Sequence, residues 1–111
     1  GFPAILIHDE GDDGITTSGI KGSFRAFTVK CTHLGCTAGW RSQLTGFKGP
    51  VIFCPCHDSV FDPKTAEVLA GPAPAPLPKI KLEINEGKIY AVDWEDPTYV
   101  KTLRVYYGGP V

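Results

Sequence analysis

The sequence predicts an all-β fold from three observations. No stretch of the 111 residues keeps an apolar period of 3.6 residues for three helical turns, so no long amphipathic helix is expected. Glycine (13 residues) and proline (10 residues) fall in short clusters between apolar segments, as turns between strands do. Residues 79–84 alternate charged with apolar side chains, which is the period-two pattern of a half-buried strand.

The first half of the chain contains three apolar segments that predict strands. Residues 2–8 are apolar and end in the acidic, glycine-containing turn 9–14. Residues 24–30 are rich in aromatic and β-branched side chains, and residues 51–53 form a compact apolar run. The mixed segment 40–50 between them predicts a connecting loop with one helical turn.

The second half begins with a turn and a proline-rich segment. Residues 62–65 (Asp-Pro-Lys-Thr) predict the turn. Four prolines in residues 71–78 remove four backbone donors and predict a stiff, extended segment. The alternating strand that follows leads into a hairpin turn at 85–88 and a return strand at 88–94, and residues 100–107 predict a last strand.

Composition and charge narrow the classes of function. The chain has the length of one domain, with 11 basic and 12 acidic residues and a net charge of −1, so nothing favours nucleic acid as a partner. No apolar run approaches the about 20 residues of a membrane-spanning helix. Because the chain begins at glycine, we expect it to be the soluble part of a longer protein.

Two motifs contain every cysteine and two of the three histidines. They are Cys-Thr-His-Leu-Gly-Cys at 31–36 and Cys-Pro-Cys-His-Asp-Ser at 54–59. In each, a cysteine and a nearby histidine can converge on one side of an extended loop. A set of two cysteines and two histidines suits either tetrahedral zinc or a [2Fe–2S] cluster with two thiolates on one iron and two imidazoles on the other. Zinc alone leaves two cysteines unexplained.

These motifs resemble the two boxes of a Rieske iron–sulfur protein of the high-potential kind found in cytochrome bc-type complexes. The proline-rich segment 71–78 resembles the loop that covers the cluster in that family. The resemblance implies an antiparallel β-sandwich with a small cluster-binding subdomain made of two loops. The chain is then a single Rieske domain over 1–111, with its cluster-binding loops at about 31–78.

The resemblance also assigns ligands for one [2Fe–2S] cluster. It implies that Cys31 and Cys54 bind the inner iron, and that His33 and His57 bind the outer iron at the protein surface. Replacing two thiolates by neutral imidazoles makes such a cluster easier to reduce.

The remaining cysteines, Cys36 and Cys56, are implied to form the disulfide that bridges the two loops. Rieske ferredoxins and ring-hydroxylating oxygenases generally lack this second pair, which argues against them. Such a disulfide persists best outside the cytosol, which places the domain on the periplasmic or external face of a membrane. The full-length protein is then expected to be membrane-anchored.

Three residues around the second motif bear on the reduction potential. Ser59 is in the family's usual place and is expected to donate a hydrogen bond to a cluster sulfide. Asp58 stands where the family usually has glycine, and Phe61 stands where it often has tyrosine. The extra carboxylate and the missing hydroxyl both predict a potential in the lower part of the high-potential range.

The implied function is proton-coupled transfer of one electron from a quinol, as the iron–sulfur subunit of a quinol–cytochrome c reductase-type complex. His33 or His57 would take the quinol proton. Leu34, Gly35 and Pro74 would form the apolar rim that docks on a cytochrome b-type membrane subunit. The electron acceptor would be a cytochrome or a copper protein.

Two alternatives stay open at this point. The first is a small Rieske electron-transfer subunit of another oxidase, similar to arsenite oxidase, which the departures at Asp58 and Phe61 keep open. The second, from a different class, is a structural zinc module.

Overall fold

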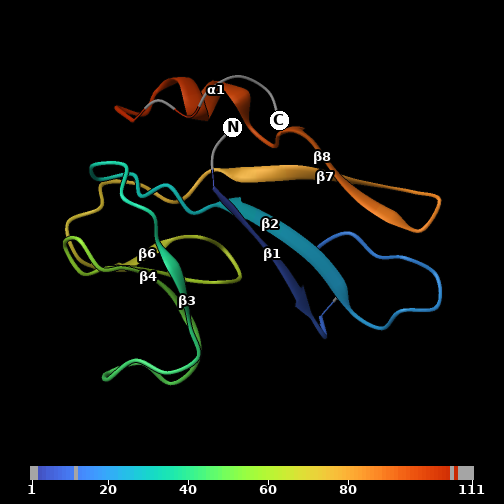
Figure 1. The fold of residues 1–111 in the computed structure, drawn as a ribbon, viewed down its shortest axis with the longest axis horizontal. Coiled ribbons are helices and arrows are strands. Elements are labelled where there is room, and N and C mark those ends of the chain that lie inside the picture. The colour runs from blue at the N-terminus through green and yellow to red at the C-terminus, as the bar shows by residue number, and fades with distance from the viewer. Residues whose placement is uncertain (1–2, 12, 106, 108–111) are drawn as a thin grey trace.

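The computed structural model describes residues 3–11, 13–105 and 107, and within them the chain forms eight strands and one short helix. The strands are β1 (Ala4–Asp9), β2 (Ser23–Thr28), β3 (Gly39–Arg41), β4 (Val51–Cys54), β5 (Ser59–Phe61), β6 (Val68–Ala70), β7 (Lys79–Asn85) and β8 (Lys88–Trp94), and the helix is α1 (Pro97–Lys101). The strands build two four-stranded antiparallel sheets (Figure 1). The predicted all-β fold is confirmed.

The larger sheet, which we call the scaffold sheet, has the strand order β1-β2-β7-β8. β1 and β2 pair over six residues, from Ala4 opposite Thr28 to Asp9 opposite Ser23. β7 and β8 form the predicted hairpin, and its turn uses positive φ angles at Glu86 and Gly87.

The smaller sheet, which we call the small sheet, has the order β3-β4-β5-β6, and its strands have only three or four residues. The expected loop at 40–50 is therefore wrong at its start, and no helical turn forms in residues 42–50. Trp40 instead pairs opposite Ile52, and the Arg41 guanidinium lies 5.0 Å from the centre of the Phe53 ring. These cross-strand contacts make the segment an edge strand.

One apolar core joins the two sheets. Phe27 comes from the scaffold sheet, Ile52 and Phe61 come from the small sheet, and Leu77 comes from the proline-rich segment. All four side chains are at most 1% exposed. The small sheet is thus packed against the scaffold sheet rather than folded around a core of its own.

The C-terminal part of the chain differs from the sequence prediction. The predicted strand at 100–107 is wrong, because α1 covers Pro97–Lys101 and residues 102–105 follow as a turn and bends. The Asp96 carboxylate accepts the Tyr99 N–H at 3.0 Å, and this helix cap, together with proline in the first turn, outweighs the apolar pattern. The helix and the residues after it pack over a second buried cluster, which consists of Ala26, Ile80, Trp94 and Tyr107.

Two residues of the predicted strands, Phe2 and Tyr106, lie outside the described residues. In the described part of the chain, no helix has the length and apolar character needed to cross a membrane.

Candidate metal centre

The first loop, residues 31–36, is a closed turn between β2 and β3. The Cys31 N–H donates to the Cys36 carbonyl at 2.7 Å, and the Gly35 N–H donates to the Cys31 carbonyl at 2.9 Å. Gly35 has a φ of +83°, a left-handed conformation that favours glycine. The turn therefore places His33 and Leu34 at its tip.

The second loop, residues 54–59, is the connection of the β4–β5 hairpin. Cys54 and Ser59 are cross-strand partners at its base, and both are buried. Asp58 has a φ of +60°, so this connection also needs a left-handed residue. Aspartate adopts that conformation more readily than most residues, although glycine does so without strain.

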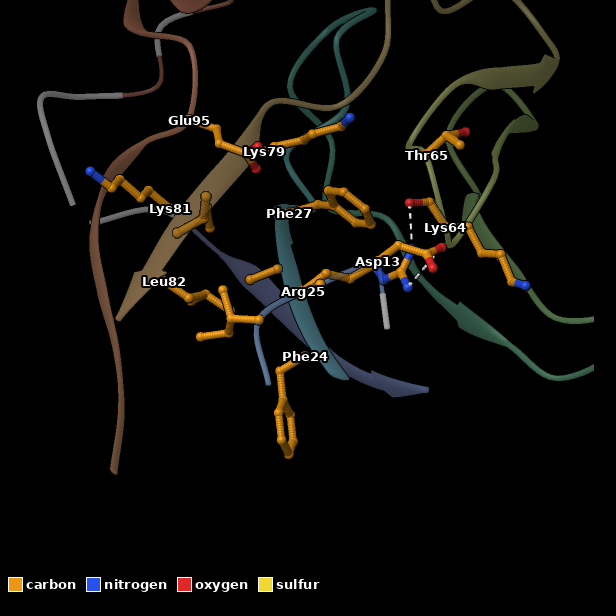
Figure 2. Close-up of a pocket in the computed structure, with 14 residues that line it drawn as sticks. Asp13, Phe24, Arg25, Phe27, Lys64, Thr65, Lys79, Lys81, Leu82 and Glu95 are labelled. Carbon is orange, nitrogen blue, oxygen red and sulfur yellow. Dashed lines mark hydrogen bonds and ion pairs between the residues drawn. The ribbon is translucent and has the colours of Figure 1, made fainter. Parts of the chain in front are cut away.

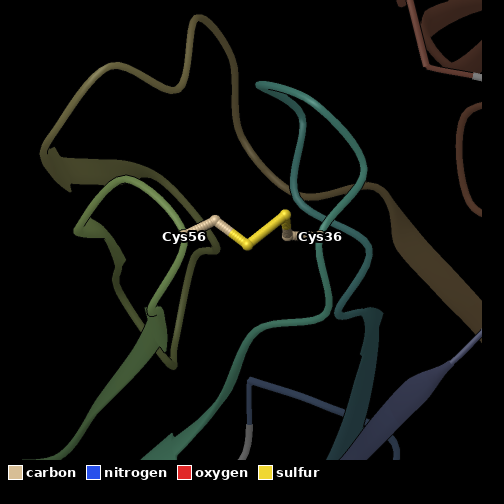
Figure 3. Close-up of a disulfide and its surroundings, with 2 residues drawn as sticks. All are labelled: Cys36 and Cys56. Atoms are coloured by element: carbon tan, nitrogen blue, oxygen red, sulfur yellow. A yellow bond between two sulfur atoms is a disulfide. The ribbon is translucent and has the colours of Figure 1, made fainter.

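A disulfide between Cys36 and Cys56 joins the two loops (Figure 3), with a Cα–Cα distance of 6.5 Å. This is the pairing that the family resemblance implies. The sulfur of Cys54 lies within 4.8 Å of both disulfide sulfurs. Because disulfide sulfurs are not thiolates, these three atoms do not form a metal site. Their short separations show that the two loops lie in contact at this point.

The two free cysteines, Cys31 and Cys54, are each 1% exposed. Burial raises the pKa of the Cys31 thiol, and the neighbouring Cys54 raises it further. Hydrogen bonds from the His33 backbone and the Ser59 hydroxyl act in the opposite direction. A buried thiol whose ionisation is opposed in this way is the kind of group that a bound cation relieves.

The imidazoles of His33 and His57 lie together, with ring centroids 4.6 Å apart and ring planes at 84°. His57 is exposed and His33 is half-buried. The His33 Nδ1 atom is buried and has no hydrogen-bond partner among the described residues. An unsatisfied buried nitrogen normally destabilises a fold, so this atom fits a ligand of a bound group.

Residues 71–78, which we call the proline loop, close one side of this arrangement. The Thr32 hydroxyl donates to the Ala75 carbonyl at 2.6 Å, and the Ser59 hydroxyl oxygen accepts the Ala73 N–H at 3.2 Å. Gly71, with a φ of +89°, passes so close to the second loop that a Cβ there would lie 2.5 Å from the Cα of Ser59. Both loops are thereby attached to the same segment.

Side chains of the predicted docking rim lie at the surface. Leu34 is 65% exposed, the highest value among the large apolar side chains of the described residues, and Pro74 is exposed. Gly35 is half-buried. The structure thus leaves an apolar tip on the first loop next to a histidine.

A family model described as the Rieske [2Fe-2S] domain matches residues 4–81. This range contains both loops and the proline loop. The chain belongs to the Rieske [2Fe–2S] family.

This Rieske domain is similar to the iron–sulfur subunits of cytochrome b6-f complexes and of a menaquinol:cytochrome c reductase. It is 34% identical over 83 residues to the cytochrome b6-f complex iron-sulfur subunit of Chlorobaculum tepidum, covering 75% of this chain and 42% of that protein. It is 34% identical over 70 residues to the menaquinol:cytochrome c reductase iron-sulfur subunit of Geobacillus thermodenitrificans, covering 63% and 40%. The chain therefore spans less than half the length of these relatives.

A solved structure has the same fold. The soluble domain of the Rieske protein II from Sulfolobus acidocaldarius superimposes with a TM-score of 0.57 at 27% sequence identity. The match covers 99% of this chain and 58% of that one. The antiparallel Rieske-type fold implied by the sequence is confirmed.

The residues of this Rieske domain fit the family's [2Fe–2S] cluster. Two buried thiols and two neighbouring imidazoles supply the thiolate and neutral nitrogen donors that such a cluster needs. The buried His33 Nδ1 atom, which has no hydrogen-bond partner among the described residues, is available to such a group. The structural zinc module is accordingly set aside, because the family's cofactor is the iron–sulfur cluster.

The structure describes the three residues on which the predicted low potential depends. Ser59 is 0% exposed, and its hydroxyl lowers the pKa of the Cys31 thiol, against the effect of burial. Phe61 is also fully buried and fills the core between the sheets, where it offers no hydroxyl. Asp58 adopts the left-handed conformation that explains why a glycine is usual there. The low potential inferred from these residues stays a prediction.

A separate cleft of about 760 Å³ is lined by residues of β2 and β7, by residues 13–15 and by the turn at Lys64 (Figure 2). Its lining includes neither loop. Within it, Arg25 donates to the Lys64 carbonyl at 2.8 Å and pairs with the Asp9 carboxylate at 3.0 Å. Arg25 therefore links the scaffold sheet to a turn of the small sheet.

Four residues that support the loops were not singled out from the sequence. Thr32 lies inside the first motif and Gly71 begins the proline loop, so their positions were a usable signal. Tyr99 and Tyr107 lie far from both motifs in sequence, and nothing local marks them.

Proposed function

We propose that this Rieske domain accepts single electrons from a quinol and passes them to a cytochrome or copper protein, as part of a membrane-bound cytochrome complex. Its relatives include iron–sulfur subunits of a cytochrome b6-f complex and of a menaquinol:cytochrome c reductase, which supports this proposal. The disulfide supports a location on the periplasmic or external face of the membrane. The observation that carries the proposal is the imidazole pair of His33 and His57 beside the exposed Leu34.

In this proposal, Cys31 and Cys54 are the sulfur ligands of the inner iron, and His33 and His57 are the nitrogen ligands of the outer iron. The burial of the thiols and the exposure of His57 support this order from inside to outside. The cluster, when bound, supplies one-electron redox chemistry.

The chain's own side chains would handle the proton and the docking. The exposed His57 offers an imidazole that can accept a hydrogen bond from a quinol hydroxyl and then take its proton. Leu34 and Pro74 present apolar surface that excludes water when they dock on a quinol-binding membrane subunit.

The cluster and its ligands are tested on the isolated domain. Iron and acid-labile sulfide in equal amounts, with a Rieske-type EPR signal after reduction, are expected in the wild-type domain. His57→Ala is expected to lose that signal. His8→Ala is the matched control, because His8 stacks on Phe24 in the scaffold sheet and contacts neither loop. An unchanged signal in His57→Ala would overturn the ligand assignment.

The reaction is tested on the full-length subunit in its membrane complex. A quinol is expected to reduce the wild-type cluster rapidly, and Leu34→Asp is expected to slow that reduction while leaving the EPR signal of the isolated domain intact. A full cluster that no quinol reduces in the presence of a cytochrome b-type subunit would overturn the quinol proposal and favour an oxidase subunit similar to that of arsenite oxidase.

A further inference from the structure

The residues after β8 contact the flank of the loops. We call residues 96–105 and 107 the C-terminal strap. Two tyrosine hydroxyls extend from it to backbone carbonyls: Tyr99 donates to Pro76 at 2.6 Å, and Tyr107 donates to Lys30 at 2.7 Å. One bond reaches the proline loop and the other reaches the residue before the first loop. The strap therefore touches both segments next to the site.

The hydroxyl of Tyr107 is hydrogen-bonded to the Lys30–Cys31 peptide, both of whose polar groups have partners. The carbonyl of the Lys30–Cys31 peptide accepts from Tyr107, and the N–H of the same peptide donates to the Cys36 carbonyl at 2.7 Å. This single peptide thus connects the strap, a proposed ligand and a residue of the disulfide. A peptide fixed at both ends fixes where the Cys31 side chain begins.

Tyr107 is itself firmly placed. It is 2% exposed, its ring packs edge-on against Trp94 at 5.9 Å, and the Lys30 ammonium lies 5.8 Å from the ring centre. Burial raises the pKa of the Tyr107 phenol, and the nearby Cys31 and Tyr99 raise it further. The hydroxyl therefore keeps its proton at any physiological pH and remains a donor to the Lys30 carbonyl.

We propose that Tyr107 is a positioning residue for the cluster, because its hydroxyl holds the Lys30–Cys31 peptide and so sets the place of the Cys31 sulfur. The Cys31 carbonyl in turn accepts the Gly35 N–H at 2.9 Å, so the backbone of Cys31 is held on both sides of its Cα. The inference rests on the proposed role of Cys31 as an iron ligand. Tyr107 lies outside both cysteine-containing motifs, and the proposal gives it a role in the site.

The test is Tyr107→Phe, which removes only the hydroxyl and keeps the ring against Trp94. Hydrogen exchange of the Cys31 amide, measured by mass spectrometry after the disulfide is reduced under quench conditions, is expected to speed up about five- to tenfold, the factor that one hydrogen bond of ordinary net strength gives. Iron content is expected to stay at the wild-type level. The midpoint potential, measured by protein-film voltammetry, is expected to shift.

Two further variants make the result specific. Tyr90→Phe is the matched control, because Tyr90 is 46% exposed on β8, and it is expected to change neither exchange nor potential. Tyr99→Phe removes the bond to the proline loop and is expected to leave the Cys31 amide unchanged.

Faster exchange in Tyr107→Phe without any shift of the potential would overturn the proposal, since the hydroxyl would then only stabilise the fold. A wild-type domain that binds no iron through Cys31 would instead overturn the proposed ligand set. Because iron content and amide exchange are measured separately, these two failures are distinguishable.

Discussion

The two sheets of this Rieske domain are held together in different ways. The scaffold strands have six or seven residues. β1 pairs with β2 in one continuous register, and β7 pairs with β8 along its length with a single register shift between Lys81 and Leu82. The strands of the small sheet have three or four residues, close to the lower limit for a strand. Backbone pairing therefore stabilises the scaffold sheet far more than the small sheet.

The small sheet relies on cross-links instead. The disulfide joins its second loop to the first, the proline loop is hydrogen-bonded to both, and Arg25 bonds the scaffold to the turn at Lys64. Small units that lack a sufficient core are commonly stabilised by disulfides or metals. The contacts that form the site are therefore the same contacts that stabilise the small sheet. Changes in the loops should destabilise the small sheet more than the scaffold sheet.

The largest effect is expected from Cys54→Ser, which removes a buried thiol proposed to bind iron. We expect loss of iron and sulfide and rapid amide exchange throughout the two loops. The β7–β8 hairpin is expected to keep its slow exchange, because its own pairing maintains it. Equal acceleration in both sheets, measured by hydrogen-exchange mass spectrometry, would show that the sheets are not held differently.

The next largest effect is expected from the double variant Cys36→Ser/Cys56→Ser. The disulfide closes a segment with a sequence separation of 20, so its loss is expected to lower the free energy of unfolding by about 3 kcal/mol. In a denaturant titration, the visible absorbance of the cluster should disappear before the far-UV circular dichroism of the strands does. Coincident transitions would contradict the unequal dependence of the two sheets on this bond.

A smaller effect is expected from Gly71→Ala, with Gly46→Ala as its control. Both glycines have similar positive φ angles, +89° and +93°, so both variants share the same backbone strain. Only at Gly71 would the new Cβ meet backbone atoms of Ser59, whereas nothing lies within 4 Å at Gly46. Gly71→Ala should therefore be less stable than Gly46→Ala by about 1–3 kcal/mol in thermal or chemical unfolding. Equal losses would mean that the proline loop moves away without cost.

The smallest effect on stability is expected from Asp58→Gly, compared with Glu86→Gly. Both residues are exposed and left-handed, with φ angles of 60° and 52°, so each change should alter stability by less than about 1 kcal/mol. Only Asp58 stands next to a proposed ligand, and removing its carboxylate should raise the midpoint potential in voltammetry. A potential that is equal in both variants would remove Asp58 from the tuning residues.

The sequence predicted the scaffold better than the segments around the site. The alternation at 79–84 and the turn at 85–88 are local signals, and the structure follows them. β3 was missed because a three-residue edge strand is too short to show a period, and Trp40 and Arg41 owe their conformation to partners on β4. The predicted C-terminal strand was wrong because Asp96 caps a helix and Pro97 begins it, and these two helix signals outweigh the apolar residues that follow.

Within the site, the sequence identified the two loops because metal-ligating residues at short spacings are a local pattern. It did not identify the contacts that hold the loops. The bond from Thr32 to Ala75 and the bond from Tyr107 to Lys30 each join residues far apart in the chain, with separations of 43 and 77. Such contacts form only when the fold is assembled, and the sequence around either residue does not indicate its partner.

The order of these contacts along the chain has a consequence for biogenesis. During synthesis the first loop emerges first, then the second loop, then the proline loop, and Tyr99 and Tyr107 follow later still. The loops can therefore meet while the flank that the C-terminal strap later covers is still open. The two tyrosine bonds can form only after both loops and the proline loop have been synthesised, so they are the last of these contacts to close.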